Sequence, residues 1–600
     1  MAEDRDPRLI WTEDGAPRSG RFDDVYFSQQ DGLAEARAVF LAGCGLPGKW
    51  QDRNGFCVAE LGFGTGLNIA AVLDSWRREG PPDGRLSVFS VERFPLKRDE
   101  AARALSAWPE LAEAAGALLE VWPAPTPGFH RLDLPAFNAT LDLAVGDVGW
   151  ALSQWTGRAD AWFLDGFAPS TNPDMWSDAV LDGIAARSAP AARVATFTVA
   201  GAVRRGLAQR GFAVEKRPGH GRKRERLEAH LPEVPTPPRP LPSVAVVGAG
   251  VAGAALARAF AALGVRVTVV EAERSGAGAS GFPAALVTPR LDAGDGDIAA
   301  LYAQALTRAG VLYAATHGAV IQTGVLQLEQ APRDARRFVK VEAQPGWAEG
   351  AMTVLDAAGC SARLGEPVGC GGLWMRDALA VHPAAVLEAW LGDADRVTAT
   401  VDRIEAVGEG WRLLDGAGTV IHRADVVVIA GGWGVVGLVP TMPLAPVRGQ
   451  ADWVEGVETG PVAWGGYAVP TGSGMLFGAT HERGETKGGP SDEARARNFG
   501  TIAARLPQLA ARIAAGGAVQ SRTAVRATTP DRLPLAGAVP GAAGLFILGG
   551  LGSRGFCAAP LLAEHVAALA AGAPSPLPAA LAARVDPVRN VTAAPLVQPI

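Results

Sequence analysis

The sequence predicts an α/β protein of two halves, each built on a parallel β-sheet. An apolar run at residues 56–61 leads into a glycine-rich loop and then a helical pattern, and a second such start follows at residues 243–247. Between them lies LPEVPTPPRPLP, residues 231–242, in which six of twelve positions are proline. A run of this composition forms a stiff, extended spacer. The alternative is a proline-rich surface loop inside a single domain.

The composition excludes several classes of protein. The 600 residues include 48% hydrophobic residues and carry a net charge of −6. They exclude a disordered chain and a strongly basic nucleic-acid binder, although not a local basic patch. The five cysteines form no C-x-x-C pair and the eight histidines do not cluster with acids, so neither disulfides nor a metal site is expected. With no secretory signal and no bilayer-spanning apolar stretch, we expect a soluble, cytoplasmic protein.

The two nucleotide-binding starts define the domain boundaries. We expect a first domain at residues 1–235, a proline-rich linker at 236–243 and a second domain at 244–600. Within the second domain, segments at about 290–420 and 445–525, which are rich in tryptophan and polar strands, are expected to form a mixed α+β substrate subdomain.

The first half opens with the loop ELGFGTGLN, in which three glycines alternate with other residues. Glycine lets the backbone turn tightly and approach a ligand closely. An acid at the tip of the second strand is placed to accept hydrogen bonds from ribose hydroxyls. The spacing is similar to that of a class I methyltransferase loop for S-adenosylmethionine; a tight strand–helix turn without a ligand is the alternative. The expected cofactor-binding residues are Glu60, Gly62, Gly64, Gly66, Glu92 and Asp147.

A third apolar strand, in DAWFLDGFAPSTNPDMW, ends in Asp165 and is followed by a loop rich in Gly, Pro and Asn. The carboxyl edge of a parallel sheet is where α/β proteins place their chemistry. Methyl transfer to an amine depends mainly on positioning, and a carboxylate can orient the amine and accept its proton. Asp165 is therefore the candidate catalytic residue, unless it only caps the following turn.

Residues 204–226 contain nine basic residues and two acids, within an acidic protein. Such a stretch attracts phosphates, although charge runs are more often simply solvated faces. The candidate RNA-binding residues are Arg204, Arg205, Lys216, Arg217, Arg222, Lys223 and Arg224.

The second half opens with SVAVVGAGVAGAALARAFAALGVRVTVVEAE, a G-x-G-x-x-G dinucleotide fingerprint. Gly248 makes the turn, Gly250 lets the pyrophosphate approach, and Gly253 lets helix and strand pack closely. The helix N-terminus faces the phosphate charge, and Glu271 holds the ribose.

Three later segments favour FAD over NAD. RSGAGASG follows the acid directly, whereas ADVVVIAGGWG and GLFILGGLGSRGFCAAPLLAEHVA are buried strands that end in glycines. A dinucleotide domain closed by such distant segments fits FAD-dependent amine oxidoreductases, in which a helix N-terminus stabilises reduced-flavin charge. Ordinary glycine turns are the alternative. The expected contacts are Ser280, Gly431, Gly432, Gly549, Gly552 and Gly555.

VYFSQQDGLAEARAVFL, ELGFGTGLN, SVERFPL, DAWFLDGFAPSTNPDMW and HGRKRERL closely resemble the methyltransferase half of the bacterial bifunctional tRNA 5-methylaminomethyl-2-thiouridine biosynthesis family, over about residues 8–230. PVRGQ, TPDRLPLAG and GSRGF resemble its FAD half, over about residues 243–570, which is similar to glycine oxidase and D-amino acid oxidase. Two departures occur: Thr171 stands where a lysine is expected, and Phe282 where an asparagine is expected.

The resemblance implies a bifunctional enzyme acting on the wobble uridine of tRNA. The FAD half removes the carboxymethyl group of 5-carboxymethylaminomethyluridine as glyoxylate, and the other half methylates the resulting primary amine with S-adenosylmethionine. Arg448 and Arg554 are candidates to grip the departing carboxylate, or else form structural ion pairs.

Two other classes of function compete with this interpretation. One is a small-molecule amine or amino-acid oxidase fused to a degenerate methyltransferase domain, which the intact glycine loop and DGFAPSTNP segment oppose. The other is a non-catalytic RNA-binding scaffold, which would not need two complete cofactor loops. No membrane or metal partner is expected, and nothing in the sequence demands more than a monomer.

Overall fold

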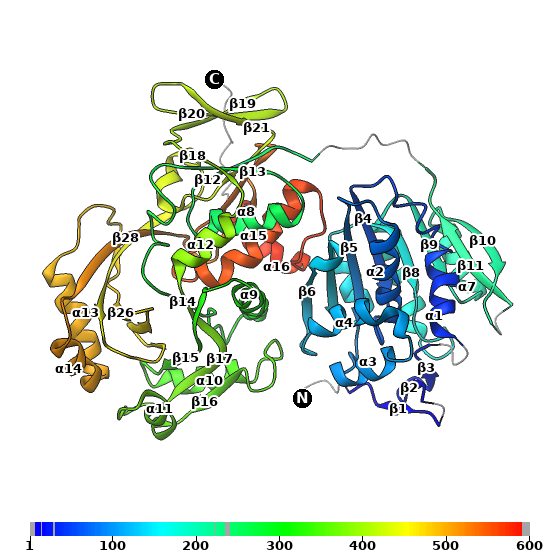
Figure 1. Cartoon of the computed structure of the whole chain (residues 1–600), viewed down its shortest axis with the longest axis horizontal. Coiled ribbons are helices and arrows are strands. Elements are labelled where there is room, and N and C mark those ends of the chain that lie inside the picture. The colour runs from blue at the N-terminus through cyan, green and yellow to red at the C-terminus, as the bar shows by residue number, and fades with distance from the viewer. Residues whose placement is uncertain (1–5, 14, 28–30, 222–223, 234–240, 591–600) are drawn as a thin grey trace. The chain divides into compact units, whose positions relative to one another are not determined.

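The computed structural model describes residues 6–13, 15–27, 31–221, 224–233 and 241–590. The chain divides into two compact units: Met1–Arg239 with Pro574–Ala579, and Pro240–Ala573 with Ala580–Ile600 (Figure 1). Most of the predicted linker, residues 236–240, lies outside the described residues. The predicted α/β fold class is confirmed in both units.

Unit 1 is built on an eight-stranded sheet of order β10-β11-β9-β8-β4-β5-β7-β6, in which β7, β5, β4, β8 and β9 run parallel. Its strands are β4 (Gly55–Leu61), β5 (Arg85–Glu92), β6 (Gly128–Leu134), β7 (Ala139–Val145), β8 (Ala159–Leu164), β9 (Ser188–Thr196), β10 (Ala213–Pro218) and β11 (Glu225–His230). Helices α2 (Leu67–Glu79), α3 (Arg98–Leu105) and α4 (Ala112–Glu120) precede β6, and α5 (Val148–Gln154), α6 (Asp178–Ala186) and α7 (Gly201–Gln209) come later.

The apolar sequence of strand β4 is explained by its burial on both faces of the sheet. Phe56 and Val58 belong to the core on one face of the sheet, together with residues of α2 and α4. Cys57, Ala59 and Leu61 belong to the core on the other face, with residues of α5, α6 and α7. A parallel strand covered by helices on both faces has no solvent side, so alternation of apolar and polar residues is absent.

A short N-terminal sheet adds to this unit. Strands β1 (Leu9–Trp11), β2 (Pro17–Ser19) and β3 (Asp24–Val25) pair antiparallel, and the short helix α1 (Gly32–Glu35) follows.

Unit 2 contains a six-stranded sheet of order β18-β13-β12-β22-β30-β29, parallel except for β29. The strands are β12 (Val244–Val247), β13 (Val267–Glu271), β18 (Asp395–Thr398), β22 (Val426–Ile429), β29 (Leu535–Ala538) and β30 (Leu545–Gly549). Helices α8 (Val251–Ala262), α9 (Gly296–Ala314), α12 (Pro383–Leu391) and α15 (Gly555–Ala571) contact one another beside it (Figure 1). Strands β19 (Arg403–Val407), β20 (Gly410–Leu414) and β21 (Val420–Ala424) form a separate antiparallel sheet.

A ten-stranded mixed sheet forms the rest of unit 2. It contains β14 (Ala285–Val287), β15 (Val320–Leu328), β16 (Met352–Leu355), β17 (Gly372–Val381), β23 (Ala445–Glu455), β24 (Val462–Ala463), β25 (Tyr467–Pro470), β26 (Gly474–Gly478), β27 (Glu482–Arg483) and β28 (Gln520–Thr528). Helices α10 (Arg333–Glu342), α11 (Ala357–Leu364), α13 (Asp492–Arg505) and α14 (Pro507–Ala515) complete it. Strand β18 lies within the range 290–420 predicted for the substrate subdomain, yet it pairs with β13 in the dinucleotide sheet.

Candidate active sites

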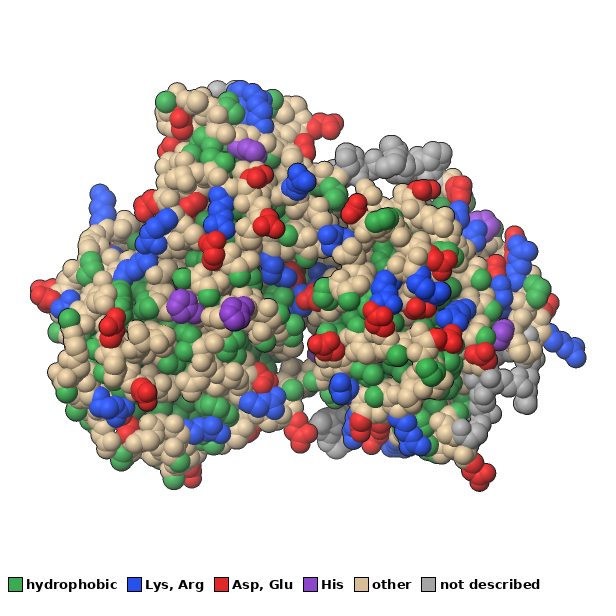
Figure 2. All heavy atoms as spheres, viewed as in Figure 1, with side chains coloured by type: hydrophobic (Ala, Val, Ile, Leu, Met, Phe, Trp, Pro, Cys, Tyr) green, Lys and Arg blue, Asp and Glu red, His purple; other side chains and the backbone are tan. Residues whose placement is uncertain are grey.

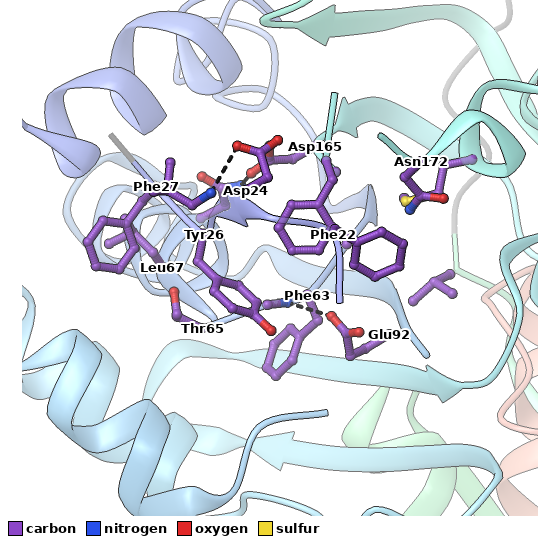
Figure 3. Close-up of a pocket in the computed structure, with 18 of the residues that line it drawn as sticks. Phe22, Asp24, Tyr26, Phe27, Phe63, Thr65, Leu67, Glu92, Asp165 and Asn172 are labelled. Atoms are coloured by element: carbon purple, nitrogen blue, oxygen red, sulfur yellow. Dashed lines mark hydrogen bonds between the residues drawn. The ribbon is translucent and has the colours of Figure 1, made fainter. Parts of the chain in front are cut away.

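Unit 1 contains a cavity of about 860 Å³ at the carboxyl ends of its parallel strands (Figure 3). Five of the predicted site residues line it, each from the end of a strand or the loop that follows: Gly62, Gly64, Glu92, Asp147 and Asp165. Gly66 and Glu60 lie outside this lining, since Gly66 caps α2 and Glu60 is buried beneath the loop.

The glycine loop after β4 is shaped for close approach of a ligand. Gly62 has a φ of 103°, and a Cβ placed on it would lie 2.2 Å from the carbonyl oxygen of Asp165. The loop and the end of β8 therefore meet through backbone, and any side chain at position 62 would fill the junction. These residues fit S-adenosylmethionine, because the backbone of the loop is exposed to the cavity at Gly64.

Two of the predicted cofactor ligands already hold the walls of the cavity in place. Glu92 accepts hydrogen bonds from the backbone N–H of Gly64 at 2.9 Å and of Phe94 at 2.8 Å, and burial raises the pKa of its carboxyl. Asp147 caps helix α5 by accepting from the N–H of Gly149 at 2.9 Å. Their predicted contacts with the cofactor stay predictions.

Asp165 faces the cavity and is held by a side chain from another element. The side-chain Nδ2 of Asn68, in the first turn of α2, donates to Oδ2 of Asp165 at 2.7 Å. Sequence reasoning did not identify Asn68, although it lies two residues beyond the last glycine of the loop.

The N-terminal segment supplies an aromatic wall opposite the strand ends. Phe22 stacks on Phe167 with ring centroids 4.7 Å apart, and Tyr26 meets the same ring edge-on at 5.5 Å. Asp24 accepts a hydrogen bond from the N–H of Ala168 at 3.2 Å, which ties this segment to the loop after β8. Burial, followed by the charge of Glu92, raises the pKa of the Tyr26 hydroxyl.

The charged side chains that line the cavity are mostly acidic. Two arginines, Arg18 and Arg93, are opposed by six carboxylates: Asp24, Glu35, Glu92, Asp147, Asp165 and Asp174. A cavity with this balance attracts cations, and both a sulfonium cofactor and an alkylamine are cationic in water.

The predicted RNA-binding residues differ in what they contact. Lys216 pairs with Glu225 at 2.7 Å, and Arg217 pairs with Glu215 at 2.6 Å. Figure 2 shows basic and acidic side chains interspersed on the part of the surface that α7, β10 and β11 form. Within the described part of the chain, no ion pair engages the exposed Arg204, Arg205 or Arg224, whereas Arg222 and Lys223 lie outside it. Thr171, at the position of the expected lysine, is exposed and donates from its hydroxyl to the Ala168 carbonyl at 3.0 Å.

The glycines of the dinucleotide fingerprint make backbone contacts that no other residue allows. A Cβ on Gly253 would lie 1.8 Å from the carbonyl oxygen of Gly248, and one on Gly248 would lie 2.4 Å from Cα of Gly431. The loops after β12 and β22 thus touch, as expected for a closed dinucleotide site. Glu271 at the tip of β13 accepts from the Ala249 N–H at 2.7 Å.

Residues from distant segments gather around the N-terminus of α8. Ser280 accepts from the Val251 N–H at 3.0 Å through its hydroxyl, and a Cβ on Gly250 would lie 3.1 Å from that oxygen. A Cβ on Gly555, the first residue of α15, would meet the Val251 side chain at 3.4 Å. The cradle fits FAD. Gly432 and Gly552 have positive φ in the loops beside it, and Gly549 ends β30.

Phe282, the second departure, lies where Arg522 of β28 holds the loop before it. The Arg522 guanidinium donates to the carbonyls of Gly276 at 3.1 Å and Gly278 at 3.0 Å, and also to that of Gly281. Its carbon Cζ lies 5.5 Å from the centroid of the Phe282 ring. The phenyl ring therefore packs beneath a cation that orders the loop.

The two candidate arginines of unit 2 have different surroundings. Arg448 pairs with Glu482, and its Nη2 donates to the carbonyls of Gly488 at 3.1 Å and Gly489 at 2.5 Å. This arrangement favours a structural ion pair, the alternative noted above. Arg554 precedes α15 and donates to the Thr288 hydroxyl, and burial lowers the pKa of its guanidinium.

Arg526 is a candidate that sequence reasoning missed. Its Nη2 is buried and has no hydrogen-bond partner among the described residues. The pKa of Arg526 is lowered by burial and by the neighbouring charge of Arg554, and Tyr467 lies close enough to oppose this shift. Burial raises the pKa of Tyr467 to about 12. A desolvated arginine without a hydrogen-bond partner destabilises the fold. We therefore expect an anionic ligand to bind its free N–H group.

The described residues contain neither a candidate membrane span nor a candidate metal cluster. No helix within the described ranges is long and apolar enough to cross a membrane. In the same part of the chain, no three His, Cys, Asp or Glu side chains are grouped to hold a metal.

Two family models match the chain. One, described as an S-adenosyl-L-methionine-dependent methyltransferase, matches residues 109–232. The other, described as an FAD dependent oxidoreductase, matches residues 243–569. The two matches fall on either side of the proline-rich segment.

Curated relatives match almost the whole chain. The tRNA 5-methylaminomethyl-2-thiouridine biosynthesis bifunctional protein MnmC of Caulobacter vibrioides is 56% identical over 95% of this chain and 95% of its own length. The protein of the same name from Caulobacter sp. is 55% identical over 97% of each chain. The one from Maricaulis maris is 43% identical over 94% of this chain and 93% of its own.

Solved structures of similar fold correspond to about half of the chain. Iminodiacetate oxidase from Chelativorans sp. aligns with a TM-score of 0.51 and 22% identity, over 57% of this chain and 98% of its own. L-proline dehydrogenase from P. horikoshii aligns with a TM-score of 0.50 and 19% identity, over 58% of this chain and 97% of its own. At these identities the likeness shows the fold alone.

Proposed function

Because the chain belongs to the family of bifunctional tRNA 5-methylaminomethyl-2-thiouridine biosynthesis proteins, we propose that it modifies the wobble uridine of tRNA in two successive steps. It is an enzyme with an FAD-dependent oxidoreductase domain and an S-adenosylmethionine-dependent methyltransferase domain. The first step removes the carboxymethyl group of 5-carboxymethylaminomethyl-(2-thio)uridine, and the second methylates the aminomethyl group that remains.

In the oxidative step, Arg526 and Arg554 bind the carboxylate of the departing carboxymethyl group. The observation in support is the buried Nη2 of Arg526, which lacks a hydrogen-bond partner among the described residues and lies near the half-buried guanidinium of Arg554. A guanidinium fork matches a carboxylate bidentately, and pairing removes the cost of two desolvated cations. Bound FAD supplies the two-electron acceptor for the C–N bond that is oxidised.

The same two cations prepare the amine. Removal of hydride from the carbon next to nitrogen requires a neutral amine, whereas a free alkylamine has a pKa of about 10. A carboxylate bound to Arg526 holds the adjacent amine near both positive charges, which disfavours the ammonium form. Water then hydrolyses the imine, so the carboxymethyl carbons leave as glyoxylate and the primary amine remains on the uridine.

In the methylation step, the primary amine enters the acidic cavity of unit 1. Six carboxylates against two arginines in the lining favour the cationic amine and the sulfonium donor. Asp165, which lines the cavity and is oriented by Asn68, accepts the proton that the nitrogen loses. Bound S-adenosylmethionine supplies the methyl group.

The tRNA backbone binds to the basic face of α7 and the β10–β11 hairpin. Arg204, Arg205 and Arg224 support this part of the proposal, because they are exposed and none of them forms an ion pair with a described residue. Lys216 and Arg217 contribute less net charge, since each is paired with a glutamate. A cytoplasmic, monomeric enzyme stays a prediction, as do the domain boundaries at residues 235 and 244.

Nucleoside mass spectrometry tests the proposal. The purified protein is incubated with tRNA that carries 5-carboxymethylaminomethyluridine, with and without S-adenosylmethionine. We expect the aminomethyl nucleoside without the methyl donor and the methylaminomethyl nucleoside with it. An unchanged nucleoside, from a protein with both cofactors bound, would refute the tRNA function and leave a small-molecule amine oxidase as the better interpretation.

A further inference from the structure

A polar side chain, Asn68, lies near two acids at the strand ends beside the methyltransferase cavity. Asn68, 7% exposed, donates to Oδ2 of Asp165 at 2.7 Å. Asn68 also lies close enough to Glu60, the acid at the end of β4 that precedes the glycine loop, to lower the pKa of its carboxyl. One side chain from α2 thus hydrogen-bonds to Asp165 after β8 and lies near Glu60 in β4, the strand that precedes the glycine loop.

Glu60 is the most deeply buried acid of this group. It is 1% exposed, and its Oε2 accepts from the Ser90 hydroxyl at 2.6 Å. Burial raises the pKa of its carboxyl well above the usual value, and the charge of Asp165 adds to the rise. Its Oε1 is buried and has no hydrogen-bond partner among the described residues, which agrees with an uncharged carboxylic acid.

We propose that Asn68 is a positioning residue for methyl transfer, which holds the Asp165 carboxylate in the orientation that accepts the proton of the substrate amine. The inference rests on the proposed methylation activity and deepens it. Asp165 contacts the substrate amine in this proposal, whereas Asn68 acts only through the Asp165 carboxylate.

The chemistry of the step explains why orientation matters. The ammonium that the acidic cavity attracts first loses one proton to water, because only the neutral amine has a free lone pair. This lone pair forms a bond to the methyl carbon, and the carbon–sulfur bond breaks with its electron pair left on sulfur. The nitrogen, now positively charged, loses a proton to Asp165. A carboxylate that rotates away from the line of the N–H bond can no longer accept this proton. Correct positioning of reacting groups raises the rate of such reactions by orders of magnitude.

The hydrogen bond from Asn68 also favours the ionised form of its partner. An N–H donor stabilises the carboxylate over the carboxylic acid, so removal of the donor raises the pH at which Asp165 ionises. A carboxyl group at position 68 would raise it further, because two acids that share one site cannot both ionise easily.

Three variants of the full-length holoenzyme test this role. Methylation is followed on tRNA that already carries aminomethyluridine, as kcat and KM between pH 5.5 and 9.5, and S-adenosylmethionine affinity is measured at equilibrium. Asn68→Ala removes the donor, and Asn68→Asp replaces it with a group of the same shape. Ser75→Ala alters a buried polar residue of the same helix that does not line the cavity, and serves as the control.

For Asn68→Ala we expect kcat to fall by about 10-fold or more, with the acidic limb of its pH profile displaced upward by about one unit. Asn68→Asp should be nearly inactive at pH 7 and recover at pH 9, which a misfolded protein would not do. Cofactor affinity should stay within about threefold, and Ser75→Ala should match the wild type.

An unchanged pH profile in both variants, or a loss confined to cofactor affinity, would overturn the inference and make Asn68 a structural or cofactor-binding residue. Failure of the proposed function is separate, because in that case the wild-type protein itself leaves aminomethyluridine unmethylated.

Discussion

The Arg308 guanidinium binds the Glu564 carboxylate through two hydrogen bonds, from Nε at 2.9 Å and from Nη2 at 2.6 Å, and both side chains are buried. Arg258 pairs with the same carboxylate. The three residues lie on α9, α15 and α8, so one acid joins the helices that pack beside the dinucleotide sheet. Since α8 and α15 also begin at the cofactor cradle, this triad connects the helix packing of unit 2 to its site.

Replacing the acid should destabilise unit 2 strongly. In Glu564→Gln two guanidiniums lose their counter-charge, and the loss of one partner of a buried ion pair costs about 3–5 kcal/mol. We expect the temperature at which bound flavin is released to fall by several degrees, as followed by flavin fluorescence. Glu388→Gln removes the acid of the exposed pair with Arg396 and should shift that temperature very little. Equal shifts in the two variants would contradict the prediction.

Arg526 is expected to be essential for the oxidative step alone. In Arg526→Gln the substrate carboxylate loses its bidentate partner, so kcat/KM for removal of the carboxymethyl group should fall by roughly 30- to 1,000-fold, or about 2–4 kcal/mol. Methylation of tRNA that already carries aminomethyluridine should not change, because that substrate has no carboxylate. The measurement is the rate of each step on its own tRNA substrate.

Arg448→Gln tests whether Arg448, rather than Arg526, binds the substrate carboxylate. Arg448 is held by Glu482 and two backbone carbonyls, so its loss should lower stability more than it lowers kcat/KM. If Arg448→Gln gave the larger specific loss of oxidation and Arg526→Gln gave none, the carboxylate would belong to Arg448.

The glycine loops, the strand-end acids and the two-unit organisation were predictable because their signals are local. Where a Cβ would lie within 2.4 Å of another backbone atom, as at Gly248 and Gly253, only glycine fits, and this requirement is visible in the sequence. The hydrophobic runs that predicted β4 and β12 are buried on every side, so periodicity plays no part in identifying them.

Asn68, Tyr26 and Arg526 were not predicted, because what makes each important is a partner far away in the sequence. Asn68 matters through Asp165, and Arg526 through its burial beside Arg554. The same reasoning explains Arg448, whose motif PVRGQ is conspicuous although its guanidinium is already occupied by Glu482. A sequence motif locates a residue, but only the fold decides whether its charge is satisfied.

Asp165→Ala should block methylation and leave oxidation intact. Without the carboxylate the amine has no positioned proton acceptor, so aminomethyluridine should accumulate in the presence of S-adenosylmethionine. The prediction is checked by mass spectrometry of nucleosides from a reaction that starts with carboxymethylaminomethyl-tRNA. Normal amounts of methylated product would remove Asp165 from the mechanism.

Arg204 and Arg205 of α7, which pair with no acid among the described residues, should contribute to tRNA affinity more than the paired residues of the hairpin. Reversal of Arg204 and Arg205 to glutamate is expected to weaken tRNA binding and to reduce its dependence on salt, because fewer counterions are released. Lys216→Glu is the comparison, since it also removes a positive charge, but one already balanced by Glu225. An unaltered salt slope in the double variant would show that the face is merely solvated.

Glu60→Gln should stabilise unit 1 increasingly as pH rises. Burial raises the pKa of Glu60 well above 4.5, so the folded state binds a proton that the unfolded chain releases above that pH. Below about pH 4.5 Glu60 is protonated in both states, so its burial adds no pH-dependent cost to folding. Above that pH, the stability of the wild type falls as pH increases toward the folded-state pKa. Glutamine copies the neutral acid and carries no such penalty. The unfolding temperatures of the two proteins should be equal near pH 4.5, and that of the variant should be higher toward pH 8.

A variant less stable at pH 8 than the wild type would mean that Glu60 folds as the charged carboxylate. Retained S-adenosylmethionine affinity in the same variant would show that a neutral side chain at position 60 suffices for the cofactor loop.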